Sequence, residues 1–76
     1  MNTEKSLFSL KTGEKAHIVR LESEGSMRRR LQDVGFSEGA AVICLLKASH
    51  GDPSAYLIKG AVIALRREDS SEIIVI

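Results

Sequence analysis

Hydrophobic and polar residues alternate in short runs along most of this chain, a pattern typical of strands with one buried face. The clearest run covers Lys15–Leu21, where Ala16 and Ile18 share one face and His17 lies on the other. The apolar pair at positions 18 and 19 interrupts the strict alternation. We therefore expect a strand over this run, with a bulge or a local twist at that pair.

One stretch has helical spacing instead. Met27, Leu31 and Val34 follow one another at i, i+4 and i+7, so a helix over residues 27–34 would place all three on its core-facing side. Ser26 precedes them and is expected to be the N-cap, with its hydroxyl accepting a hydrogen bond from a free backbone N–H. The sequence therefore predicts one short amphipathic helix.

Glycine marks the end of that helix. Gly35 suits the left-handed conformation that closes a helix, and Phe36 is placed to pack back on Leu31, as in a Schellman motif. Residues 37–39 then form a turn before the next apolar run. The end of the helix is thus more strongly defined by the sequence than its start.

Four further strands are predicted at residues 42–46, 56–59, 61–65 and 72–76. The turn-rich residues 47–54 form an exposed loop, Gly60 marks a tight hairpin or a sharp bend, and residues 66–71 form a polar turn. Five short strands and one short helix favour an all-β fold, a small barrel whose closure would remove exposed sheet edges. The residues expected to point inward are Val42, Cys44, Tyr56, Ile58, Ile73 and Val75.

Size and charge exclude several classes of protein. A chain of 76 residues is expected to form a single domain over residues 1–76, too small for a deep catalytic cleft. Its net charge of +1 and its three aromatic residues argue against binding of nucleic acid. The sequence has neither a secretory signal nor the roughly 18 consecutive apolar residues of a membrane span. We therefore expect a cytoplasmic protein that does not insert into a membrane.

Candidate chemistry is sparse. His17, His50 and Asp52 are the candidate metal ligands, but their spacing is not that of a known ligand set, so only weak transition-metal binding is considered. Cys44, the single cysteine, lies between two apolar residues and is expected in the core. The sequence contains no phosphate-binding loop and no paired nucleophile and base, so we do not expect an enzyme.

Two surfaces are candidates for binding a partner. Arg28, Arg29 and Arg30 form a cationic stretch on a nearly neutral chain, for which a solvated face, a partner-docking surface and a phosphate-contact patch are all considered. Leu45 and Leu57, like Ile74, alternate with residues assigned to the core and are expected to face outward. A one-residue error in register would reverse that assignment.

An ordered set of short motifs covers almost the whole chain. The sequence resembles the FeoA family, although Glu38 and Ser70 stand where that family often has proline and alanine. The resemblance implies an SH3-like barrel in a small cytosolic protein that accompanies FeoB, the membrane GTPase that imports ferrous iron in bacteria. The motifs are Arg30-Leu31, Val34-Gly35-Phe36, Gly39, Gly51-Asp52-Pro53, Gly60, Ile63-Ala64-Leu65-Arg66, Ile73 and Val75.

The function implied by the resemblance is that of an accessory in ferrous iron uptake. It implies a non-enzymatic module that docks on FeoB and modulates it, with Arg28, Arg29, Arg30, Leu45 and Leu57 as candidate contacts. The alternative is a small metal-binding or metal-sensing barrel, because a similar barrel forms the C-terminal domain of iron-dependent repressors. No helix-turn-helix precedes the barrel here, so we do not expect the chain to be such a repressor by itself. No cofactor is expected, and the oligomeric state is left open.

Overall fold

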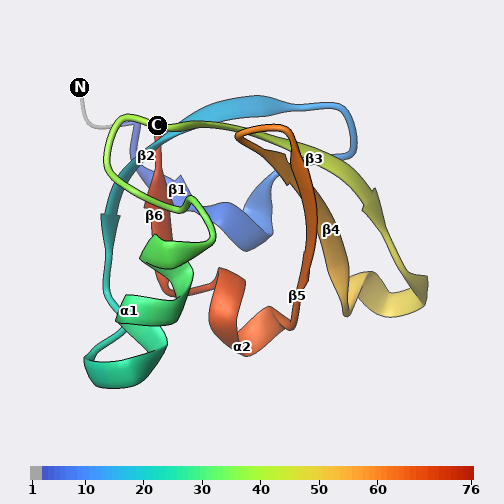
Figure 1. Ribbon diagram of the computed structural model, residues 1–76. Helices are drawn as coiled ribbons and strands as arrows, with labels where there is room; N and C mark the ends of the chain where they lie inside the picture. Colours follow the sequence, from blue (N-terminus) through green and yellow to red (C-terminus); the bar gives the residue numbers. More distant parts are fainter. Residues whose placement is uncertain (1–2) are drawn as a thin grey trace.

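The structure is a computed structural model that describes residues 3–76. Over this range the chain forms six strands, the helix α1 (Gly25–Asp33) and the single-turn helix α2 (Arg67–Ser70), as shown in Figure 1. Two 3₁₀ turns, η1 (Leu7–Ser9) and η2 (Ser49–Gly51), complete the described elements. The strands are β1 (Lys5–Ser6), β2 (Lys15–Leu21), β3 (Ala41–Lys47), β4 (Ser54–Ile58), β5 (Ala61–Leu65) and β6 (Ile73–Val75).

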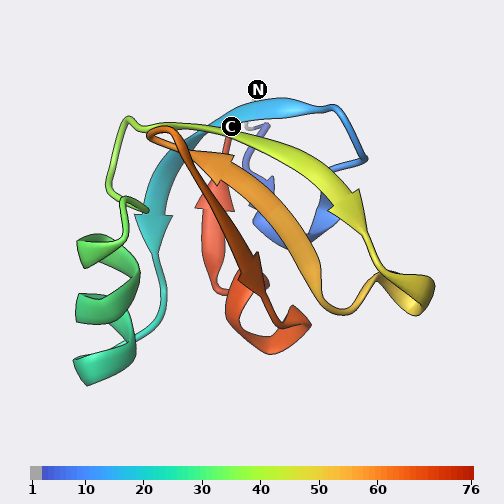
Figure 2. The ribbon, with the colours of Figure 1, turned by 45° about the vertical axis from the view of Figure 1, so that its right-hand side comes forward.

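The strands form one antiparallel sheet in the order β1-β6-β2-β3-β4-β5. The sheet curls strongly into a half-open barrel, with α1 standing beside it (Figure 2). The predicted all-β barrel with a short helix is therefore confirmed. There are six described strands instead of five, because residues 5 and 6 pair with β6. The expectation that the barrel closes fully was wrong, because β5 is the last strand of the sheet and pairs with β4 only.

A register shift in β2 creates the curl. Ala16 pairs with Val42 of β3, whereas Ile18 pairs with Val75 of β6, and the register shifts between Ile18 and Arg20. The expected irregularity at the apolar pair is thus confirmed. Because a bulge increases local bending and twist, β2 can belong to both halves of the sheet.

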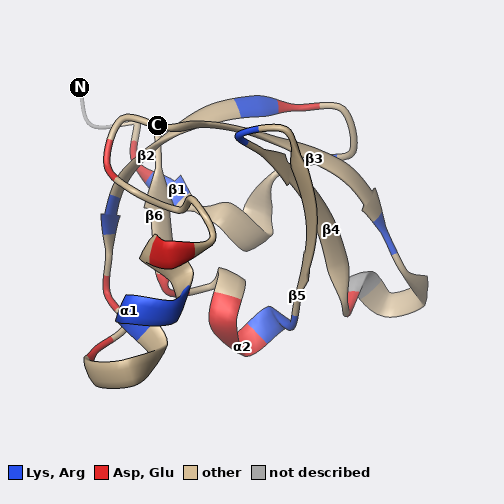
Figure 3. Cartoon of the chain, in the orientation of Figure 1, with Lys and Arg blue, Asp and Glu red and all other residues tan. Residues whose placement is uncertain are grey.

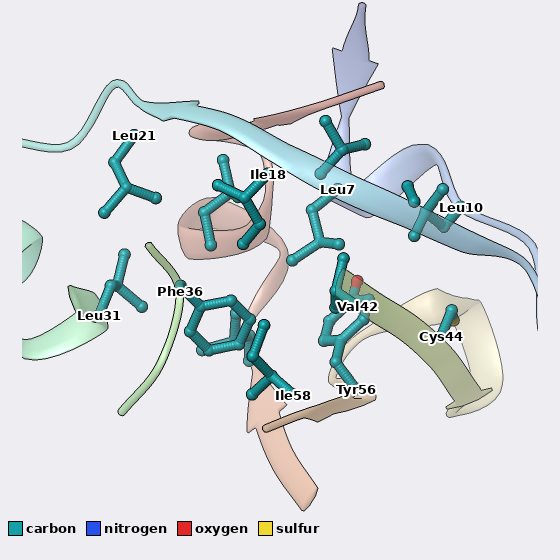
Figure 4. Packing of buried hydrophobic residues seen from close by; sticks show 14 residues of the cluster. Leu7, Leu10, Ile18, Leu21, Leu31, Phe36, Val42, Cys44, Tyr56 and Ile58 are labelled. Carbon is teal, nitrogen blue, oxygen red and sulfur yellow. The ribbon is translucent and has the colours of Figure 1, made fainter. Parts of the chain in front are cut away.

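Side chains from all the longer strands meet in one core beside α1 (Figure 4). All six side chains expected to point inward are buried, and Cys44, Tyr56 and Val75 among them have no exposed surface. Burial raises the pKa of the Tyr56 hydroxyl, although the nearby hydroxyls of Ser70 and Ser54 act in the opposite direction. The strand registers inferred from alternation were therefore correct.

The end of α1 is a Schellman motif, as predicted. The Phe36 N–H donates to the Leu31 carbonyl over 2.9 Å, and the Gly35 N–H donates to the Gln32 carbonyl over 3.1 Å. Gly35 has a φ of 120°, which favours glycine. Phe36 is fully buried and lies close to Leu31 in Figure 4.

Two details of α1 differ from expectation. The N-cap is Glu24, not Ser26, and no side-chain hydrogen bond caps the helix. Gly25, with a φ of 62°, begins the helix two residues earlier than expected. Val34 is 42% exposed instead of lying in the core. It occupies the C-cap, where the chain leaves the helix, and Phe36 folds back to fill the buried position that helical spacing assigned to it.

Gly60 lies in a two-residue hairpin turn, so of the tight hairpin and the sharp bend considered from sequence, the hairpin is correct. Ile58 pairs with Ala61, while Lys59 and Gly60 both have positive φ, 47° and 80°. This is the combination typical of the type I′ turns that connect antiparallel strands. The turn predicted after β5 contains the single-turn helix α2.

Candidate partner-docking surfaces

The three consecutive arginines of α1 do not act alike. The Arg28 guanidinium donates to the Leu21 carbonyl over 2.7 Å and is half-buried, so it joins α1 to the end of β2. Arg29 and Arg30 are exposed, and within residues 3–76 neither belongs to a salt bridge. Figure 3 shows these charges as a blue band on α1. Of the three, Arg29 and Arg30 are therefore free to meet a partner.

A groove separates α1 from β5. It has a volume of about 260 Å³ and lies between Val34 on the helix and Ile63 on the strand, which is half-buried. Arg30 and Arg66 line its two sides, and Asp69 of α2 contributes one carboxylate. The groove combines exposed apolar surface with an excess of cationic side chains.

Apolar residues also form a row on the outer face of the sheet. Leu57 of β4 lies directly opposite Ile43 of β3 and Val62 of β5. Val62 is 63% exposed, and Leu57 is half-buried. Leu45, at 36% exposure, lies beside this row where the register of β3 shifts. Leu45 and Leu57 thus face outward as expected, and the cross-strand pairing adds Ile43 and Val62.

Some residues of these surfaces were missed from sequence. The alternation in Ala61–Leu65 contained the signal for Val62, because Ile63 and Leu65 point toward the core. Arg66 had no such signal, since its position beside α1 depends on how the sheet curls. Sequence therefore identified the exposed apolar side chains better than the neighbours they acquire.

The three candidate metal ligands do not form a site with other ligands. His17 and His50 are both exposed, and the Asp52 carboxylate accepts the Arg67 backbone N–H over 3.0 Å. In the part of the chain that the structure describes, no three side chains of His, Cys, Asp or Glu are placed to hold a metal ion together. Burial also raises the pKa of the Cys44 thiol, which disfavours the thiolate that binds metals.

A second cationic cluster lies beside α2. The Lys47 ammonium lies 4.4 Å from the centre of the Phe8 ring, and the Arg67 guanidinium lies 5.0 Å from it. Lys47 also donates to the Phe8 carbonyl, so its position is defined by intramolecular contacts. This arrangement is a cation–π cluster that joins η1 to the end of β3 and to the start of α2.

None of the helices within residues 3–76 combines the length and the apolar character needed to cross a membrane.

The curled antiparallel sheet and its single longer helix place the chain among small SH3-like barrels. One similar protein is FeoA from Stenotrophomonas maltophilia in complex with zinc, described as a procaryotic SH3 domain protein, with a TM-score of 0.84. It is 23% identical, and the match covers 93% of this chain and 88% of that one. At this identity the likeness shows the fold alone. The expected SH3-like class is therefore confirmed.

The chain belongs to the FeoA family, because the model of the FeoA domain matches residues 5–76. FeoA from Chlorobium tepidum is 33% identical, with a TM-score of 0.86, and the match covers 93% of this chain and 69% of that one. An Fe(2+) transport protein A/Fe(2+) transporter FeoB fusion protein from Porphyromonas gingivalis is 39% identical over 67 residues. The match covers 88% of this chain but only 8% of that relative's length. The family is one of Fe(2+) transport, and the resemblance noted from sequence is confirmed.

The fold is shared with metal-dependent repressors. A manganese-dependent transcriptional repressor has a TM-score of 0.88 at 17% identity, and the match covers 100% of this chain and 42% of that one. This likeness shows only that the same barrel occurs in both kinds of protein.

Proposed function

We propose that this domain is a non-enzymatic interaction module that docks on the cytosolic GTPase portion of a FeoB-like ferrous iron transporter. The observation that carries the proposal is the Porphyromonas gingivalis relative, in which transport protein A and the transporter FeoB are fused. Fusion raises the effective concentration of two modules for each other, which benefits modules that bind. In a separate chain the same encounter would depend on surface recognition.

The surface chemistry supports docking. Arg29 and Arg30 are exposed on α1, and arginine is enriched at protein interfaces because its planar group pairs with carboxylates and its stem packs on apolar surface. The groove beside Arg30 offers apolar area next to these charges, and the outer row with Leu57 and Val62 offers a second apolar surface. Such a combination of apolar area and cationic rim is typical of a docking surface.

A docked module without nucleotide chemistry of its own can act only through differential affinity. If it binds one conformation of the transporter better than another, it raises the population of that conformation. The same argument holds whichever step of the transport cycle is favoured. The domain thus modulates the transporter by binding, and the GTPase reaction remains with the transporter.

Charge reversal on α1 tests the proposal. The double variant Arg29→Glu, Arg30→Glu is expected to raise the Kd for the full-length transporter in lipid nanodiscs by about tenfold, because two interface cations become anions. The control Lys11→Glu, Lys15→Glu reverses two exposed charges away from α1 and should bind like the wild type. Circular dichroism would verify that both variants are folded. Equal affinity of all three proteins would contradict docking through α1.

A further inference from the structure

The edge of β5 has unpaired backbone groups. β5 is the last strand of the sheet, and its partner β4 is connected to it by a two-residue turn. That turn makes Ile58 and Ala61 a hydrogen-bonded pair, and along an antiparallel ladder hydrogen-bonded and non-hydrogen-bonded pairs alternate. Val62 and Ala64 belong to non-hydrogen-bonded pairs, so their N–H and C=O groups point away from β4. Two donors and two acceptors therefore face outward at this edge.

The free edge of β5 faces the groove. In Figure 1, β4 lies on one side of β5, and α1 with α2 lies on the other. Ile63, Ala64 and Leu65 line the groove from the strand side, and Val34, 42% exposed, lines it from the helix. An extended chain laid along this edge would pair with the backbone of β5 and place alternate side chains against apolar surface.

We infer that β5 receives an added strand: an extended segment of the partner transporter, apolar at alternate positions and flanked by acidic residues, pairs with Val62 and Ala64 and fills the groove beside α1. This inference rests on the proposed function, because it names the segment type through which the transporter binds. The volume of about 260 Å³ is below the roughly 300–1,000 Å³ of small-molecule sites, which favours a few peptide side chains over a metabolite.

Charge determines the chemistry of the segment. Arg30 and Arg66 stand on the two sides of the groove, against the single carboxylate of Asp69. The Arg66 guanidinium lies 3.8 Å from the Glu68 carboxylate, but both side chains are more than 70% exposed, so solvent weakens this ion pair. Acidic residues next to the added strand would meet the two arginines and fix its position along β5.

A second copy of this chain fits the same edge less well. Antiparallel pairing of Ala61–Leu65 with itself through its outward groups would be centred on Ile63. At both ends of that pair, Lys59 in the turn before β5 would lie near Arg67 of the second copy, which is the first residue of α2, and like charges brought close together repel each other. The cationic rim therefore favours an acidic partner over self-association.

A proline substitution tests the added strand directly. Ala64→Pro removes an outward N–H but leaves the bonds of β5 to β4, which is why proline is tolerated at such positions of edge strands. Losing one backbone hydrogen bond at the interface should raise the Kd for the full-length transporter in nanodiscs about three- to tenfold. The control Ala64→Val keeps the N–H and should bind within about twofold of the wild type.

Amide exchange provides a second measurement that does not depend on the variant. In the wild-type chain, Val62 and Ala64 should exchange quickly when free and at least about tenfold more slowly when bound to the transporter, because their N–H groups become hydrogen-bonded. Ile63 and Leu65, already bonded to β4, should change little. This residue-by-residue alternation is specific to strand addition and would not arise from side-chain contacts alone.

The possible results separate this inference from the proposed function. Binding by the wild type without protection of Val62 and Ala64, or without loss in Ala64→Pro, would overturn strand addition and leave docking intact. No binding by the wild-type chain would overturn both. A dimer of the free chain in sedimentation, with the same two amides protected, would overturn the transporter segment as the occupant and assign the edge to a second copy.

Discussion

Leu31 connects the helix to the core at the point where the helix ends. Its carbonyl accepts the Phe36 N–H, and its side chain is 3% exposed beside the fully buried Phe36. Val34, three residues later, belongs by spacing to the same stripe but is 42% exposed, because the Schellman turn brings Phe36 inward in its place. Residues of one predicted stripe thus have different energetic roles.

This difference can be measured with two truncations. Leu31→Ala should lower the free energy of unfolding by about 2–5 kcal/mol, since it leaves a cavity in the core. Val34→Ala should lower the free energy of unfolding by less than about 1 kcal/mol, because the Val34 side chain is already 42% exposed and its loss leaves no closed cavity. Urea denaturation followed by circular dichroism measures both. Similar losses in the two variants would contradict the placement of Val34 outside the core.

At the scale of elements, α1 is held to the sheet by few interactions. Leu31 is its one buried residue, and Met27 is only partly buried against the core. The hydrogen bond from Arg28 to the Leu21 carbonyl adds a connection to the end of β2. Arg28 therefore helps to hold the helix in place, whereas Arg29 and Arg30 are exposed at the surface.

Arg28→Ala should consequently destabilise the fold, whereas Arg29→Ala should not. Loss of a half-buried hydrogen bond from a charged donor is expected to lower the free energy of unfolding by about 1 kcal/mol. The same truncation at exposed Arg29 should change it by less than about 0.5 kcal/mol. Thermal or urea unfolding of the two variants provides the comparison, and equal stability would show that the Arg28 bond contributes nothing.

The longer elements could be predicted because their patterns are local. Alternation placed Val42, Tyr56 and Val75 in the core, and the glycine with its following aromatic residue defined the end of α1. The strand β1, only Lys5–Ser6, has no apolar pattern and exists through its pairing with β6. The helix α2 has only four residues and no apolar stripe. Elements defined by distant partners leave no periodic signal in the sequence.

For the whole molecule, the open side of the barrel matters most for function. The expectation of closure followed from the need to cover sheet edges, yet β5 has an unpaired edge that faces α1 across the groove. The charges of the candidate site were visible in the sequence at Arg29 and Arg30. The sequence did not show that these arginines lie near Arg66 and the edge of β5, because that proximity depends on the curl introduced at the bulge of β2.

The central claim is that this side of the domain binds the GTPase portion of a FeoB-like transporter. The most direct test is an NMR titration of the isotope-labelled chain with the soluble GTPase domain of the same organism's transporter, with Fe(2+) under anaerobic conditions as a parallel titration. The account predicts shifts gathered at Arg30, Val34, Ile63 and Ala64 on addition of the GTPase domain. No shifts with the GTPase domain, together with Fe(2+)-induced shifts around His17, His50 or Asp52, would contradict docking and indicate a metal-binding protein.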